Sequence, residues 1–157
     1  MNTPQESATA LFYGMPLRAA MDPACFGLMP IARPLTAGQV VHVGARDLDP
    51  AEIDFIDAAG IRRVTVQQIG DDPLAVSKAF AKSGFSRLYV HLDLDVLEPA
   101  EFPYTPLPVE GGISGAELVG VLESVWKNVV GLGLCEYAPV GMRHPLVERI
   151  IDLGLSL

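Results

Sequence analysis

Two aspartates, Asp93 and Asp95, lie two residues apart in the stretch LYVHLDLDVLEP, which otherwise has the alternating pattern of a strand (residues 88–99). Apolar side chains at every second position from 88 to 96 predict an extended chain with one buried face. Tyr89, His91 and the two aspartates occupy the other face. Because two neighbouring carboxylates repel each other unless a positive charge lies between them, this pattern indicates a cation site.

The spacing of Asp93 and Asp95 suits metal chemistry. Alternate residues of a strand lie about 6.6 Å apart along the backbone, so the two side chains could each reach a different ion or share a bridging one. Hard divalent ions such as Mn²⁺ and Mg²⁺ prefer carboxylate ligands. Paired metals about 3.5–4 Å apart generate a hydroxide nucleophile at neutral pH. The alternative is that one aspartate caps a helix or turn while the other pairs with an arginine.

Other residues could join such a site or have ordinary roles. His91 shares the acidic face, but we interpret it as a half-buried histidine with satisfied hydrogen bonds rather than as a ligand. Glu136 closes the apolar run VVGLGLCEYAP. A buried glutamate needs a partner, and either a guanidinium substrate or an arginine would serve. Asp49 precedes Pro50 and is explained equally well as a helix N-cap.

These residues must be positioned by strands and helices that take turns along the chain. We expect strands at 39–45, 62–66, 87–96 and 129–139. We expect helices at 50–60, 73–84, 115–128 and 144–155. The signals for the first three are N-caps at Asp49, Asp72 and Ser114, the third residues Glu52 and Glu117, and the stops Gly60 and Gly84. The alternation predicts βαβ units, hence a mainly parallel sheet with helices on its faces, in one domain over residues 1–157.

Ligands of such sheets gather at the carboxyl ends of the strands, which narrows the search for a site. Arg46, Asp47 and Asp49 follow the first expected strand, the two aspartates of the opening stretch end the third, and Glu136 ends the fourth. We therefore expect these acids to converge on one edge of the sheet, which would attract cations.

Composition agrees with a small globular protein that handles cations. Half of the 157 residues are apolar, and the net charge of −8 argues against nucleic acid as a partner, because phosphate binding needs clustered Lys and Arg. Cys25 and Cys135 are the only cysteines, so a disulfide framework is not expected, and Cys135 is interpreted as a buried thiol. No signal peptide or membrane span is recognisable, so we expect a cytoplasmic protein without membrane contact.

Four segments together resemble the arginase–agmatinase (ureohydrolase) family. HLDLDVLEPAEFPYTPLPVEGGIS (91–114) is similar to its Asp-x-Asp signature with the Pro-rich loop and Gly-Gly that follow. HVGARDLDPAE (42–52) is similar to its Gly-x-Arg-Asp-x-Asp-Pro segment, GLCEYAP (133–139) to its late Glu-x-Asn-Pro segment, and NTPQESATALFYGMPL (2–17) to its Asn-Thr-Pro segment. The four segments occur in the family's order and cover most of the chain.

The resemblance implies a three-layer α/β/α fold with a mainly parallel sheet and a binuclear Mn²⁺ centre that hydrolyses a guanidino compound to urea and an amine. It implies that Asp93 and Asp95 are metal ligands and that Glu136 receives the substrate guanidinium. By the same resemblance, Asp49 lies near the amino end of the substrate, while Asn2 and Thr9 belong to the loop that binds its carboxylate end. Arginine, agmatine, guanidinobutyrate and formiminoglutamate remain open as substrates.

The sequence also departs from the family. The upstream motifs Gly-Gly-Asp-His and Asp-Ala-His-x-Asp are absent, which leaves two of the six metal ligands and an arginase-like sheet incomplete at its N-terminal side. The strand carrying the second motif would lie between 39–45 and 89–95, so those strands must pair directly, leave a gap or borrow a strand. Tyr13 occupies the position of a proton-shuttling histidine in arginases, so we retain it as a candidate catalytic residue.

Two functional hypotheses follow. The first is that the chain is the C-terminal part of a Mn²⁺-dependent guanidino hydrolase and is inactive without the upstream segment. The second is a metal-free remnant of the family that acts as a structural or regulatory partner. Under either hypothesis, we expect the open sheet to make the isolated chain marginal in solution or self-associating, and we expect a homo-oligomer.

Overall fold

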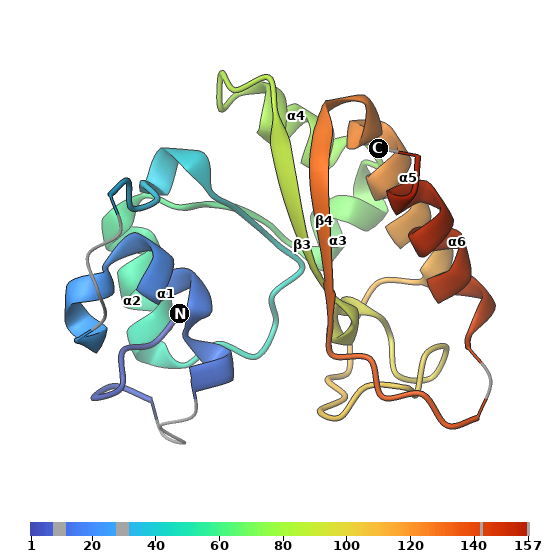
Figure 1. Ribbon diagram of the computed structural model, residues 1–157, viewed down its shortest axis with the longest axis horizontal. Helices are drawn as coiled ribbons and strands as arrows, with labels where there is room; N and C mark the ends of the chain where they lie inside the picture. Colours follow the sequence, from blue (N-terminus) through green and yellow to red (C-terminus); the bar gives the residue numbers. More distant parts are fainter. Residues whose placement is uncertain (8–11, 28–31, 142, 157) are drawn as a thin grey trace. The chain divides into compact units, whose positions relative to one another are not determined.

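The computed structural model describes residues 1–7, 12–27, 32–141 and 143–156, and the chain divides into two compact units (Figure 1). The first unit consists of Met1–His42 and Asp47–Arg63, and the second of Val43–Arg46 and Val64–Leu157. The expectation of a single domain over residues 1–157 stays a prediction.

The first unit is mainly helical. It contains α1 (Pro16–Met21), α2 (Pro50–Ala59) and the 3-10 turns η1 (Phe12–Gly14), η2 (Pro23–Phe26) and η3 (Ala37–Gln39). Helix α2 begins and ends as predicted. Asp49 and Glu52 form a capping box at its start, and Gly60 ends it in the left-handed conformation with φ of 68°. Its apolar face packs into a core made of Met1, Val40, Ile56 and Ile61.

Strands β1 (Val41–Val43) and β2 (Arg62–Val64) form a two-stranded sheet. Both are shorter than predicted. The sequence left open whether the first expected strand pairs directly with the third. Within the described ranges β1 does not pair with β3, so this direct pairing is not found.

The second unit carries the longer strands. Strands β3 (Leu88–Asp93) and β4 (Val129–Cys135) run parallel, in a register that pairs Asp93 with Cys135. Its helices are α3 (Val66–Asp71), α4 (Ala75–Ala81), α5 (Gly115–Val125) and α6 (Pro145–Gly154), with 3-10 turns η4 (Leu94–Val96) and η5 (Trp126–Asn128). The expected parallel α/β arrangement is therefore confirmed.

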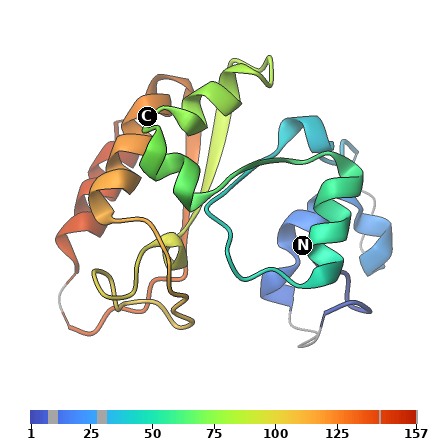
Figure 2. The same ribbon diagram turned by 180° about the vertical axis from the view of Figure 1, so that it is seen from behind.

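The two faces of the β3–β4 pair differ as the alternating sequence predicted. Figures 1 and 2 show α3 to α6 on one side of the two strands. Leu92 is buried, whereas Tyr89, which alternation places on the opposite face, is 62% exposed. His91 is also exposed, so the expectation that it is half-buried was wrong. Helix α5 begins with the predicted capping box of Ser114 and Glu117.

The third strand ends earlier than its pattern suggested. β3 stops at Asp93, and residues 94–96 form the 3-10 turn η4. The apolar pattern continues beyond the end of the strand because the turn and the residue after it are also buried. Leu94 and Leu97 are 0% and 2% exposed. Asp93 and Asp95 therefore do not follow each other along one strand face, and the spacing of about 6.6 Å that a strand would impose does not apply.

A helix was also missed between β2 and α4. Thr65 and Gln68 form a capping box that starts α3, and this Thr-x-x-Gln signal is visible in the sequence. Asp72, expected to cap one long helix, instead follows α3, and α4 begins only at Ala75. Asp72 accepts hydrogen bonds from the Leu74 N–H at 3.0 Å and the Lys78 ammonium at 2.7 Å.

No helix within the described part of the chain is long and apolar enough to cross a membrane.

Candidate functional site

Asp93 lies at the carboxyl end of β3, beside the end of the parallel strand β4. Its Oδ1 atom is buried and has no hydrogen-bond partner among the described residues. Burial, followed by the negative charges of Asp95 and Glu136, raises the pKa of the Asp93 carboxyl to about 6. Strand pairing thus holds this half-buried carboxylate where no protein group donates a hydrogen bond to its Oδ1 atom.

Asp95 lies in η4, directly after the end of β3. Burial raises the pKa of its carboxyl, and the positive charge of Arg46 acts in the opposite direction. Arg46 also holds the main chain here, since its Nη2 donates to the Asp95 carbonyl at 2.7 Å. The turn therefore presents a second half-buried acid next to the first.

Glu136 follows β4 and is half-buried. Its φ of 55° makes it the one non-glycine residue in the described ranges with a left-handed backbone. This conformation costs an ordinary L-residue about 1–2 kcal/mol, and such strain gathers at functional sites. The unusual backbone turns the chain away from the sheet at the position where the third acid lies.

The segment that follows Glu136 is fixed by an aromatic cluster. Tyr137 stacks on Phe102 at 6.0 Å between ring centroids, and Phe102 is 2% exposed. The Tyr137 hydroxyl accepts a hydrogen bond from the His144 N–H at 2.9 Å, and the Ala138 N–H donates to the Tyr104 carbonyl at 2.8 Å. These contacts hold the strained turn against the Pro-rich loop.

The two ends of the Pro-rich loop, residues 98–112 (the rim loop), are also joined, a feature that sequence reasoning missed. The Glu98 Oε2 atom accepts hydrogen bonds from the Gly111 and Gly112 N–H groups, both at 2.9 Å. Gly112 has no room for a side chain, because a Cβ there would lie 2.3 Å from the Leu97 carbonyl carbon. The adjacent glycines Gly111 and Gly112 were the signal in the sequence that the backbone approaches Leu97 closely here.

The metal-free chain should lose stability as the pH rises from about 4 to about 6, through the pKa range of Asp93. The folded state binds the Asp93 proton more tightly than the unfolded state, so the penalty is absent below the unfolded pKa and complete above the folded one. We expect this contribution to be about 1 kcal/mol, below the full value of the shift because the carboxyl is partly solvated.

Urea unfolding at a series of pH values checks this pH dependence. Asp93→Asn should be more stable than the unaltered chain above pH 6 and equal to it near pH 4. The matched control is Asp152→Asn on α6, which removes an exposed charge and should leave the pH dependence unchanged. A constant difference between Asp93→Asn and the parent across this range would contradict the prediction.

Residues Asp93 and Asp95 fit one side of a metal site. An unpartnered buried carboxylate oxygen and a raised pKa are both features that a bound divalent cation would relieve. Carboxylates are also the ligands that Mn²⁺ and Mg²⁺ prefer. However, no group of three or more His, Cys, Asp or Glu residues in the described ranges is placed to hold an ion. The described residues therefore provide an incomplete coordination sphere.

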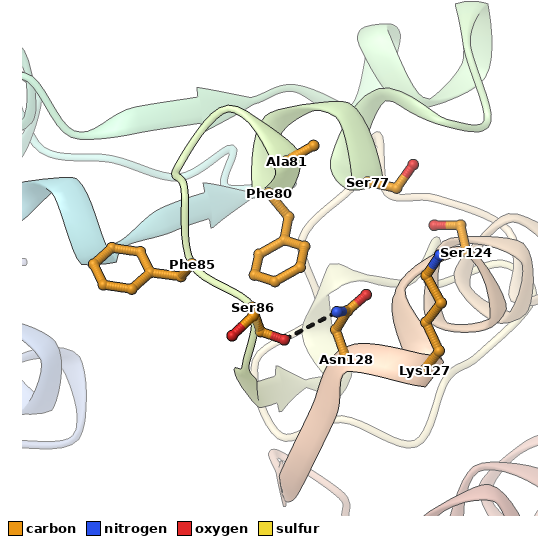
Figure 3. A pocket seen from close by; sticks show the side chains of 8 residues that line it. All are labelled: Ser77, Phe80, Ala81, Phe85, Ser86, Ser124, Lys127 and Asn128. Atoms are coloured by element: carbon orange, nitrogen blue, oxygen red, sulfur yellow. Dashed lines mark hydrogen bonds between the residues drawn. The ribbon is translucent and has the colours of Figure 1, made fainter.

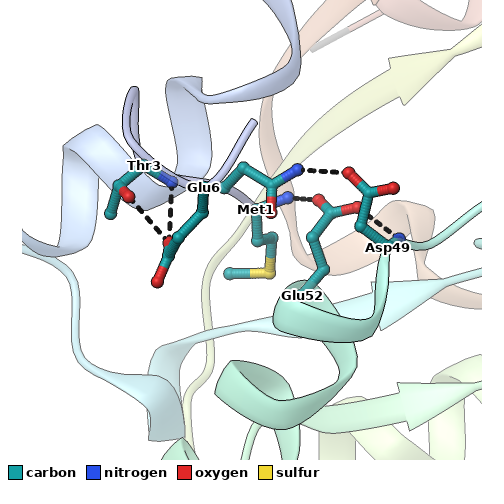
Figure 4. Close-up of polar contacts among 6 residues, drawn as sticks. Met1, Thr3, Glu6, Asp49 and Glu52 are labelled. Carbon is teal, nitrogen blue, oxygen red and sulfur yellow. Dashed lines mark hydrogen bonds and ion pairs between the residues drawn. The ribbon is translucent and has the colours of Figure 1, made fainter. Parts of the chain in front are cut away.

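The remaining predicted residues lie in the first unit. Asn2 is buried, and its Nδ2 donates to Asp49 Oδ2 at 2.7 Å, so two predicted substrate residues are brought together. Figure 4 shows Asp49 beside Glu52, which accepts from the Asp49 N–H at 3.0 Å and forms an ion pair with the amino group of Met1. Asp49 thus has its N-cap role, and its role near a substrate stays a prediction.

The side chains of two predicted site residues are not described. Thr9 lies outside the described residues, and Tyr13 lies in η1 without a described side chain. The convergence of Asp47 and Asp49 with the acids of the second unit also stays a prediction. Cys135, expected to be buried, is only half-buried. Burial and the charges of Asp93 and Glu136 raise the pKa of its thiol.

A separate hollow of about 460 Å³ lies at the opposite end of β3 (Figure 3). It is lined by Phe80 on α4, by Phe85 and Ser86 before β3, and by Lys127 and Asn128 after α5. The Asn128 side chain closes one wall by donating to the Ser86 carbonyl at 2.9 Å. None of the predicted site residues lines this hollow, so it is distinct from the acidic cluster.

Comparison with known proteins identifies the family. The model of the arginase family matches residues 1–144, which is most of the chain. The chain belongs to the arginase family. This confirms the family recognised from the four sequence segments. The matched residues include Asp93, Asp95 and Glu136.

Curated arginase-family relatives match most or all of the chain. It is 28% identical to Arginase-1 of Sus scrofa over 173 residues, covering all of this chain and 53% of the relative. It is 32% identical to the N(1)-aminopropylagmatine ureohydrolase of Thermus thermophilus over 118 residues, covering 73% of this chain and 40% of the relative. The chain thus spans about half the length of the curated relatives it matches.

Solved arginases share the fold. The arginase of Entamoeba histolytica, in complex with L-ornithine, gives a TM-score of 0.83 at 23% identity, covering 98% of this chain and 54% of that one. The arginase of Bacillus cereus gives 0.81 at 26% identity, covering 99% and 56%. The arginase-like α/β fold is therefore confirmed, and it is incomplete in this chain relative to these structures.

Proposed function

We propose that this chain supplies part of the active site of a Mn²⁺-dependent hydrolase that releases urea from a guanidino compound. The observation that carries the proposal is the cluster of Asp93, Asp95 and Glu136 at the carboxyl ends of two parallel strands. Membership of the arginase family supports hydrolysis of a guanidino group, and two relatives are named arginase and aminopropylagmatine ureohydrolase.

In this proposal Asp93 and Asp95 hold the metal. The buried, unpartnered Oδ1 of Asp93 is a ready ligand atom, and the main-chain bond from Arg46 restrains Asp95. The chemistry that Mn²⁺ supplies when bound is the activation of water at neutral pH. Because these two carboxylates alone make a weak site, the remaining ligands come from outside the described residues.

Glu136 is proposed to bind the planar guanidinium of the substrate. A carboxylate can accept two parallel N–H bonds from a guanidinium, which fixes both the position and the orientation of the reacting carbon. The strained backbone and the aromatic cluster behind it would hold the carboxylate still. Asn2, Thr9 and Asp49 are proposed to bind the other end of the substrate, and Tyr13 to take part in proton transfer.

A second candidate function rests on one specific observation. The described residues contain no group of three or more potential ligands in position to hold a metal. A chain that never acquires the remaining ligands would be a metal-free member of the family, acting as a structural or regulatory partner. Its open sheet edges would then serve self-association or association with a relative, and a homo-oligomer is proposed in either case.

The deciding experiment uses the native polypeptide, captured from its source cells with an antibody against this chain. Its intact mass is measured first. Urea release is then measured with arginine, agmatine, guanidinobutyrate and aminopropylagmatine, and release of the corresponding amide with formiminoglutamate. The proposed hydrolase should release product, lose activity in EDTA and regain it with Mn²⁺. A native species of 16.8 kDa that binds no Mn²⁺ and turns over none of these compounds would favour the metal-free candidate.

A further inference from the structure

Every N–H group of the Arg46 guanidinium donates to the main chain around the acidic cluster. A guanidinium has five N–H groups and no acceptor. Each of the five donates to a backbone carbonyl of the second unit, at 2.6 to 3.3 Å. The acceptors are the carbonyls of Gly44, Asp95, Val96, Val109 and Glu110. No N–H group is left to bind a carboxylate or a substrate.

Gly44 is a near neighbour of Arg46 in sequence, and the other four carbonyls come from two distant pieces of chain. Asp95 and Val96 belong to η4 at the end of β3, whereas Val109 and Glu110 lie at the closing end of the rim loop. A single rigid group therefore fixes the backbone of a proposed metal ligand to the far end of a loop about fifteen residues long. Without it, closing so long a loop would depend on Glu98 and on the short contact between residues 97 and 113.

Two neighbouring features fit the same role. Glu98 accepts hydrogen bonds from the N–H groups of Gly111 and Gly112, the two residues after those that Arg46 binds. Arg46 and Glu98 together therefore hold the backbone of residues 109–112. Gly44 lies so close to Val96 that an added Cβ would meet its Cγ2 at 2.6 Å. The strand end is thus brought near enough for the guanidinium to reach across.

We propose that Arg46 is a positioning residue that fixes the backbone of Asp95 and the closing end of the rim loop relative to each other, and so preorganises the Asp95 carboxylate for its ligand. The part concerning a metal rests on the function proposed above. The part concerning the backbone does not, because it follows from the five carbonyl contacts. Lysine cannot replace Arg46, because an ammonium has three donors on a flexible stem and lacks the planar fork.

The test compares Arg46→Lys with the unaltered full chain by amide hydrogen exchange. The Gly111, Gly112 and Ile113 amides should exchange about 10-fold faster or more in Arg46→Lys, while the amides of β4 keep their rates. The matched control is Arg149→Lys on α6, whose guanidinium pairs with Glu123 on the surface at 2.8 Å, and which should change none of these rates. Unchanged exchange at the three amides would overturn the proposal.

A second readout separates positioning from general stability. In the Mn²⁺-loaded native enzyme, Arg46→Lys should weaken Mn²⁺ binding about 10- to 100-fold, measured by electron paramagnetic resonance under conditions where the protein is fully folded. Arg149→Lys should bind as the parent does. Faster exchange with unchanged Mn²⁺ affinity would overturn the preorganisation of Asp95.

The experiment also distinguishes the two proposals. If the parent binds no Mn²⁺, the proposed function fails while the exchange result still decides the role of Arg46. If Arg46→Lys does not fold, Arg46→Ala is compared with and without added free guanidinium at millimolar concentration. Failure of guanidinium to slow exchange at Gly111, Gly112 and Ile113 would equally overturn the proposal.

Discussion

An Asp93→Asn variant of the proposed hydrolase is expected to bind Mn²⁺ at least about 100-fold more weakly than the parent and to lose urea release in proportion. Even residues that only orient metal ligands cost about 10- to 100-fold in metal affinity when they are changed, so a direct ligand should cost at least as much. The amide keeps the shape of the side chain but removes the negative charge that would offset the cation. Metal titration followed by activity at saturating Mn²⁺ measures both effects.

The Asp93→Asn variant should also change the stability of the metal-free chain, in the opposite direction to its metal affinity. Burial and the charges of Asp95 and Glu136 raise the pKa of Asp93, so removing its charge should relieve repulsion in the metal-free chain. We therefore expect Asp93→Asn to bind metal worse while unfolding at a higher urea concentration at neutral pH. Asp152→Asn should alter neither property. Full Mn²⁺ affinity in Asp93→Asn would reject the ligand assignment.

Glu136→Gln is expected to leave the metal content intact and to abolish most turnover. Truncating one partner of a desolvated charge pair costs about 2–5 kcal/mol, which corresponds to a fall in kcat/KM of roughly 30- to 5000-fold. The fold should not suffer, because glutamine has nearly the same size and the Phe102 cluster supports the following residues. Steady-state kinetics and metal analysis of the same preparation measure the two outcomes together.

Two further variants make the Glu136 prediction specific. Glu148→Gln on α6 makes the same chemical change at an exposed position and should keep normal kinetics. Glu136→Gly should relieve the left-handed backbone and so raise the free energy of unfolding by up to about 1 kcal/mol while losing turnover. Normal kinetics in Glu136→Gln would exclude it as the guanidinium-binding acid.

Local signals in the sequence predicted the parts of the fold that are decided locally. Helix α2 was predicted from Asp49, Pro50, Glu52 and Gly60 because capping is settled by backbone groups within one turn. The same holds for Ser114 and Glu117 at α5. Thr65 and Gln68 carried an equally clear signal for α3, but the Asp-Pro pair that follows them was taken as the helix start.

What could not be predicted depends on contacts distant in sequence. The alternation of residues 88–96 did not reveal that the strand ends at Asp93, because Leu94 is buried in a turn just as it would be in a strand. The left-handed backbone of Glu136 has no sequence signature, since glycine or asparagine is the usual choice there. The reach of Arg46 to carbonyls more than sixty positions away emerges only from the folded chain.

The way the rim loop is held has a consequence for how this protein can change. Arg46 and Glu98 contact only backbone groups of the loop, and the Tyr104 carbonyl rather than its ring accepts the bond from Ala138. Residues 105–108 can therefore exchange their side chains without loosening these tethers, and Leu107 is already 53% exposed. A library randomised at these positions should yield a high share of folded variants, so the sequence of the loop could diverge while its backbone stays in place.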